Sequence, residues 1–185
     1  MDIQLVPNRE CGACTVCCEL PAILDPALRK APGVRCSNCL PQGGCGIYET
    51  RPETCRGHYC AWRRLAQFDE SWRPDLSKVY IELKSDPPEK YRHEFPDAPF
   101  GIRFTLLGEL DPPRLGLLAT TIASLVQSDV PVILSIAPPP GHLGSRILLN
   151  RGLKPFATNP GLPFLEAFAK ALHTLQAIPP EKVTL

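Results

Sequence analysis

All nine cysteines of this 185-residue chain fall within its first 60 residues. They are Cys11, Cys14, Cys17, Cys18, Cys36, Cys39, Cys45, Cys55 and Cys60. Packing alone does not explain this crowding, because thiolates separated by two residues can turn their sulfurs onto a single ion. The spacing therefore predicts a metal-chelating segment in front of an ordinary folded domain, with all nine cysteines as candidate ligands.

The composition indicates a globular protein of the cytoplasm. Apolar residues make up 44% of the chain and charged residues 21%, a balance typical of folded domains. The amino-terminal residues lack a basic head followed by an apolar run, so no secretory signal and no membrane contact are expected. Stable disulfides are uncommon in a reducing compartment, and an odd number of cysteines would leave one unpaired, so metal ligation is favoured.

The chain changes character near residue 64. Residues 8–62 have little hydrophobic periodicity and are rich in glycine, proline and cysteine, which is typical of irregular loops without an apolar core. We predict a cysteine-rich metal-chelating lobe over residues 1–64 and a small α/β body over residues 65–185. The expected fold class is α+β or α/β, with the irregular lobe packed on a three- or four-stranded sheet that carries two main helices.

Hydrophobic patterns place the regular elements of the body. Alternating or β-branched apolar runs predict strands at residues 79–83, 102–107, 130–136 and 146–150. Helical spacing of leucines predicts helices at residues 111–126 and 163–177. Within the lobe, short helices are expected at residues 25–30 and between residue 51 or 52 and residue 68.

The first cysteine motif, residues 11–18, has the pattern Cys-x-x-Cys-x-x-Cys-Cys. Ferredoxin-type loops use this spacing to deliver three ligands to an iron–sulfur cluster, and zinc sites also draw on Cys-x-x-Cys pairs, so both metals stay open. Adjacent side chains of an extended backbone point to opposite sides. Cys17 and Cys18 are therefore expected to serve different sites.

A second set of cysteines follows. Cys36 and Cys39 form another x-x pair, and Cys45 is flanked by glycines that would allow the backbone to approach a bound ion closely. His58 is a candidate nitrogen ligand, although a surface histidine is the more common role for such a residue. Eight cysteines can fill two four-coordinate sites, or four can hold a cluster; spacing leaves this partition open.

A longer string follows the second set. Residues 45–56 read Cys-Gly-Ile-Tyr-Glu-Thr-Arg-Pro-Glu-Thr-Cys-Arg. Together with the opening motif, this string resembles the YkgJ-like cysteine-cluster family of zinc- or iron-chelating proteins, over residues 11–62. The family's cysteine-rich part is also similar to that of flagellin lysine methylases, but this chain shows no glycine-rich loop for a methyl donor.

The resemblance implies metal chelation by the cysteines that match its motif. These are Cys11, Cys14, Cys17, Cys18, Cys45 and Cys55, with Cys36 as the match of the family's intervening cysteine. Cys39 and Cys60 are candidates from spacing alone. Arg51 and Arg56 are expected to offset the negative charge of the thiolates, and Tyr48 to cover the site from water.

The leading hypothesis is a metal-binding protein that chelates zinc, iron or an iron–sulfur cluster. Its α/β body would serve as a scaffold or as the surface for an unidentified protein partner. One alternative is a redox or transferase-type enzyme that uses the cluster near the loop around His142. Another is a zinc-ribbon nucleic-acid binder, and the net charge of +1 argues against a nucleic-acid partner.

Overall fold

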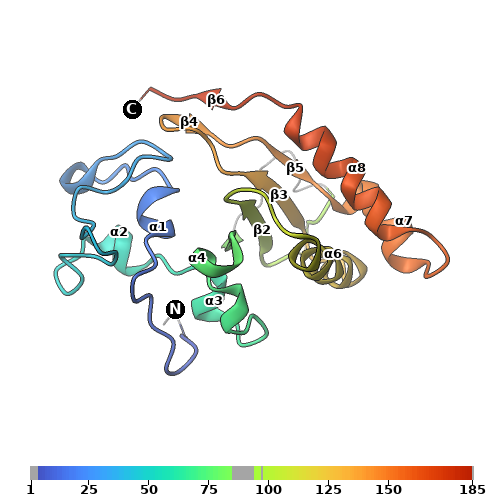
Figure 1. The fold of residues 1–185 in the computed structure, drawn as a ribbon, viewed down its shortest axis with the longest axis horizontal. Coiled ribbons are helices and arrows are strands. Elements are labelled where there is room, and N and C mark those ends of the chain that lie inside the picture. The colour runs from blue at the N-terminus through green and yellow to red at the C-terminus, as the bar shows by residue number, and fades with distance from the viewer. Residues whose placement is uncertain (1–3, 85–93, 97, 185) are drawn as a thin grey trace. The chain divides into compact units, whose positions relative to one another are not determined.

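The computed structural model describes residues 4–84, 94–96 and 98–184 (Figure 1). It confirms a mixed α+β class with a four-stranded sheet. The chain groups into two compact units. The first runs as far as Ile81 and includes Ala137–Gly144 and the chain from Pro180 on, whereas the second combines Glu82–Ile136 with Ser145–Pro179. The predicted boundary at residue 64 stays a prediction.

The first unit is built from short elements. Its helices are α1 (Val16–Glu19), η1 (Pro26–Leu28), α2 (Glu53–Arg56), α3 (Ala61–Arg64), η2 (Glu70–Trp72) and α4 (Pro74–Ser77). Its small sheet pairs β4 (His142–Leu143) with β6 (Glu181–Lys182) in antiparallel fashion. The single helix expected between residues 51 and 68 is wrong, because the backbone turns extended at Cys60 and separates α2 from α3.

The cysteine-rich stretch has almost no apolar interior. Within residues 4–60, the buried residues are only Lys30, Pro32, Cys36 and Cys60. An apolar cluster begins directly afterwards, where Ala61, Trp62, Phe68, Trp72, Val79 and Tyr80 are buried. The loops that carry the cysteines are therefore held by backbone hydrogen bonds and not by hydrophobic packing of their own side chains.

The main sheet has the strand order β1-β2-β3-β5. The strands are β1 (Val79–Lys84), β2 (Gly101–Leu106), β3 (Val132–Ile136) and β5 (Arg146–Leu148). β2 and β3 are parallel, with Phe104 opposite Leu134, and β5 is antiparallel to β3. All four predicted strands are present, and β2 and β3 are buried along most of their length.

Three helices complete the second unit: α6 (Pro112–Gln127), α7 (Asn150–Thr158) and α8 (Phe164–Gln176). They pack against one another, and both α6 and α8 contact β3 (Figure 1). Asp111 caps α6 as its sequence predicts, because its carboxylate accepts a 2.8 Å hydrogen bond from the backbone amide of Arg114.

Helix α7 lies partly where a strand to residue 150 was expected. The amide of Asn150 explains the difference, because it accepts a hydrogen bond from the backbone of Val132 and donates one to the carbonyl of Val130, both at 2.7 Å. Asn150 is thus bound to the end of β3 while the chain turns into α7. No helix in the described part of the chain is long and apolar enough to cross a bilayer.

Candidate metal centre

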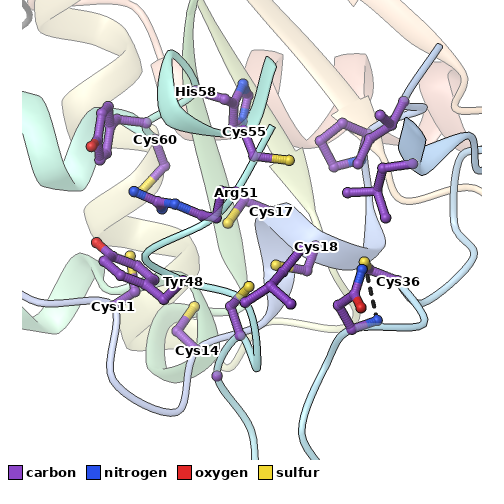
Figure 2. Close-up of a pocket in the computed structure, with 18 of the residues that line it drawn as sticks. Cys11, Cys14, Cys17, Cys18, Cys36, Tyr48, Arg51, Cys55, His58 and Cys60 are labelled. Atoms are coloured by element: carbon purple, nitrogen blue, oxygen red, sulfur yellow. Dashed lines mark hydrogen bonds between the residues drawn. The ribbon is translucent and has the colours of Figure 1, made fainter. Parts of the chain in front are cut away.

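Eight of the nine cysteines line one cavity of about 640 Å³ in the first unit (Figure 2). They are Cys11, Cys14, Cys17, Cys18, Cys36, Cys45, Cys55 and Cys60. All nine cysteines have free thiols. The structure therefore brings together residues that are up to 49 positions apart, from Cys11 to Cys60, around one space.

The first cysteine loop turns tightly before it enters α1. The amide of Cys14 donates a 2.9 Å hydrogen bond to the carbonyl of Cys11, and Gly12 between them takes a φ of +53°. Cys17 and Cys18 follow within the helical turn of α1, so the expected extended backbone is wrong at this point. Their thiols hydrogen bond to each other and line the same cavity.

The second cysteine loop repeats this turn and is joined to the first. The amide of Cys39 donates to the carbonyl of Cys36 at 3.1 Å, and the amide of Cys36 donates to the carbonyl of Cys18 at the same distance. Cys39 also pairs with Cys45 in a short antiparallel bridge. Cys39 is not among the residues that line the cavity, although its thiol hydrogen bonds to that of Cys18, which does line it.

The glycines before Cys45 line the cavity and also lie against the first cysteine loop. They approach the backbone of the first loop: a Cβ atom on Gly43 would stand 2.4 Å from the carbonyl oxygen of Ala13, and one on Gly44 would stand 3.2 Å from that of Gly12. Gly43 also takes a φ of +94°. These two glycines therefore allow the two cysteine loops to lie against each other.

The paired thiols of Cys17 and Cys18 differ in acidity. The hydrogen bond between them, reinforced by burial, raises the pKa of Cys17 well above its ordinary value. The same hydrogen bond is the main reason that the pKa of Cys18 falls to about 6. Within the pair, the thiolate is therefore favoured at Cys18, with Cys17 as the hydrogen-bond donor.

Other thiols of the cavity resist ionisation. Burial raises the pKa of Cys14 to about 11 and also raises that of Cys60. Burial raises the pKa of Cys11 as well, although the nearby guanidinium groups of Arg63 and Arg51 oppose the shift. A metal that binds these sulfurs must therefore displace their protons.

Cationic side chains surround the thiols. The guanidinium of Arg51 lies 3.8 Å from the centre of the Tyr48 ring, and both residues line the cavity (Figure 2). Arg63 also lines the cavity, although no sequence motif predicted this role. Arg56, expected beside Arg51, instead forms an exposed ion pair with Glu53 at 3.1 Å and is not among the lining residues.

The two histidine candidates have different positions. His58 lines the cavity, and its Nε2 atom is hydrogen bonded to the hydroxyl of Tyr80. His142 lies in β4, where its Nδ1 atom is 3.0 Å from the carbonyl oxygen of Pro140, and it is not among the lining residues. His142 thus lies outside the cavity lining, although the amide of the neighbouring Gly141 donates a 2.8 Å hydrogen bond to the carbonyl of Pro32 in the cysteine-rich stretch.

The donor set fits a soft metal in its chemistry, because thiolate sulfur is a preferred ligand of zinc and of iron–sulfur clusters. Among the residues that the structure describes, no three Cys, His, Asp or Glu side chains already form a group that could hold a metal ion. The sulfurs therefore line a common space but would have to draw closer together to chelate. Coupling between metal binding and local ordering is usual for small cysteine-rich segments.

Comparison with known proteins adds no relative. A scan against protein-family models, a search of curated proteins and a search of solved structures each returned no match for this chain. Its function must therefore be argued from its own residues.

Proposed function

We propose that this protein binds zinc or iron, including iron in an iron–sulfur cluster, through the thiolates of its cysteine-lined cavity. One observation carries the proposal: eight free thiols from four separate segments of the chain face a single space. Unrelated structural cysteines have no reason to converge in this way, because each could be buried independently. The resemblance of residues 11–62 to cysteine-cluster proteins points in the same direction.

The scarcity of buried side chains in residues 4–60 supports the same function. A stretch of this length without an apolar core gains little from the hydrophobic effect. Metal–thiolate bonds would cross-link the loops and supply the missing stabilisation, as in other small metal-binding folds. Zinc would act as a structural cross-link, whereas an iron–sulfur cluster would also supply one-electron chemistry.

The protein's own charges suit a thiolate-rich centre. Arg51 and Arg63 lie close enough to Cys11 to favour its ionised form. Lys30 is only 9% exposed; burial lowers the pKa of its ammonium, and negative charge on the neighbouring cysteines would oppose that shift. These cations would offset the negative charge that several thiolates bring to a metal centre.

The ligands proposed for the metal are drawn from the eight cysteines of the cavity and from Cys39, whose thiol hydrogen bonds to that of Cys18. A reducing compartment such as the cytoplasm belongs to the proposal, because nine thiols that serve a metal must stay reduced. The structure offers no support for the enzyme alternative, since His142 is not part of the cavity lining.

The test is metal analysis of protein purified without oxygen. We expect near-stoichiometric zinc, or iron with sulfide and a brown colour, in the wild-type protein. Serine at Cys11, Cys14 or Cys55 should sharply reduce the metal content and loosen the loops. Ser37→Ala, a change at an exposed residue that does not line the cavity, is the control and should retain the metal. Folded wild-type protein without zinc or iron would contradict the proposal, as would full metal content in the three cavity variants.

A further inference from the structure

The cavity has a volume of about 640 Å³. Pockets for small organic ligands usually fall between roughly 300 and 1,000 Å³. The apolar side chains of Ile23, Leu28 and Ile47 and the rings of Tyr48 and Tyr59 form part of its wall. The wall thus offers surface for an organic molecule as well as sulfur for a metal.

Arg63 contributes a buried guanidinium, two of whose nitrogens have no hydrogen-bond partner among the described residues. The residue is 8% exposed and lies in the last turn of α3. Its Nε and Nη1 atoms are buried, and neither finds an oxygen or sulfur acceptor among the described residues. Buried donors are nearly always satisfied in folded proteins, and leaving one without a partner costs about 1–3 kcal/mol. The Nε–H and Nη1–H bonds of a guanidinium diverge, so each of these two donors would need an acceptor of its own.

Arg51 presents one further buried donor, although its guanidinium also hydrogen bonds to Tyr59 and Tyr48. Its Nε atom is also buried without an acceptor among the residues described. Stacking on Tyr48 at 3.8 Å holds the guanidinium plane in place. Arg63 lies similarly near Tyr59, with 5.9 Å between its guanidinium carbon and the ring centre. Each arginine of the pair is thus supported by a phenol ring of the cavity wall.

We propose that the cavity binds a small organic anion whose carboxylate or phosphate group pairs with Arg63 and Arg51. A guanidinium presents a planar fork of N–H donors that matches both kinds of oxyanion. The apolar portion of the ligand would contact the tyrosine rings and the aliphatic wall. Glu10 also lines the cavity and would repel an anion placed beside it. The anion would share the cavity and both arginines with the proposed metal centre, and binding measured with and without metal separates the two roles.

The experiment uses three probes on the whole protein: benzoate, phenyl phosphate and the uncharged benzyl alcohol. Binding is measured by calorimetry at low salt, both on protein as purified and after removal of metal with a chelator. We expect benzoate or phenyl phosphate to bind and benzyl alcohol not to bind detectably. The stronger of the two anions identifies the oxyanion that the site prefers.

Arg63→Gln should weaken anion binding at least 10-fold, because it removes the charge and the fork. Arg64→Gln is the matched control: Arg64 is the next residue of α3 and is not among the lining residues. It should bind the anion as the wild type does. In wild-type protein, the nuclear magnetic resonance signal of the Arg63 Nε–H group should shift on titration with the anion. This measurement does not depend on the folding of any variant.

Two results would overturn the proposal. One is the absence of binding by both anions together with an unmoved Arg63 signal. The other is anion binding that Arg63→Gln leaves unchanged. A loss of metal from Arg63→Gln in protein that binds neither anion would show that the arginine serves only the thiolates, which also contradicts an anion site.

Discussion

The Nε2 atom of His58 lies 2.5 Å from the hydroxyl oxygen of Tyr80. Tyr80 lies in β1 and is fully buried, and the two rings are stacked with their centres 6.4 Å apart. A histidine between two cysteines resembles a metal ligand in sequence, yet this nitrogen is engaged by a phenol. This hydrogen bond gives His58 a structural role, because it ties the segment between Cys55 and Cys60 to β1.

The first prediction concerns this hydrogen bond. Tyr80→Phe should lower the free energy of unfolding by about 1–2 kcal/mol, because it leaves the imidazole nitrogen without its hydroxyl partner. His58→Ala should likewise lower the melting temperature while the metal content stays at the wild-type value. Thermal unfolding and metal analysis of the same samples provide the measurement. Loss of metal in His58→Ala at unchanged stability would identify His58 as a ligand after all.

The second prediction concerns the contact between the cysteine loops. Gly43→Ala should destabilise the protein by about 2 kcal/mol or more, because a positive φ is strained for alanine and the new methyl group would collide with the carbonyl of Ala13. Separation of the loops should also reduce the metal content. Denaturant unfolding and metal analysis test both effects.

Gly12→Ala is the control for the Gly43 variant. Gly12 also has a positive φ, but a Cβ atom there would meet nothing within 4 Å. It should therefore show the conformational strain alone, about 1–2 kcal/mol. Equal effects of the two substitutions would mean that the close approach of the loops contributes nothing.

The third prediction concerns the buried ammonium of Lys30. Its Nζ atom donates to the carbonyl oxygens of Glu19 at 2.9 Å and Pro21 at 2.5 Å. Lys30→Met should cost about 1–3 kcal/mol, because these carbonyls lose their donor. Arg29→Met, a change at the exposed neighbouring residue, should have little effect. Equal stability of the two variants in denaturant unfolding would remove Lys30 from this role.

The fourth prediction is a pH dependence in the second unit. Burial acts to raise the pKa of Glu82, but the charges of Arg103 and Lys84 outweigh burial and hold this pKa below its ordinary value. Lys84 Nζ lies 2.9 Å from the carboxylate, and Arg103 Nε lies 2.7 Å from it. The folded state therefore favours the charged carboxylate more than the unfolded chain does.

The sign follows from this difference. Ionised Glu82 stabilises the fold fully above the unfolded pKa of 4.5, and this contribution is lost as the pH falls from there through the lower folded pKa. Glu82→Gln should remove that part of the acid dependence and destabilise the protein by about 2 kcal/mol at pH 7. This is less than the ~3–5 kcal/mol of a fully buried pair, because the Arg103 side chain is 25% exposed. Unfolding free energies of wild type and variant that run parallel from pH 7 to pH 3 would contradict the assignment.

Local pattern was enough to predict the elements of the second unit. Alternation predicted β1 and β2, and the Asp111-Pro112-Pro113 sequence predicted the start of α6, because strand alternation and helix capping depend on neighbouring residues. Helix α7 escaped prediction. Its first residue, Asn150, is held by hydrogen bonds to a strand about twenty positions earlier, and no local pattern records such a partner.

The cysteines show the same division. The sequence alone determined that the cysteine thiols are concentrated in the amino-terminal third of the chain. Its hydrophobic pattern determined that strands and helices alternate afterwards. Only the tertiary structure decided that eight thiols face one cavity, that Cys39 and Arg56 do not, and that Arg63 does. The reason is physical: spacing constrains ligands within one turn, whereas the meeting of separate loops depends on long-range backbone contacts such as that between Gly43 and Ala13.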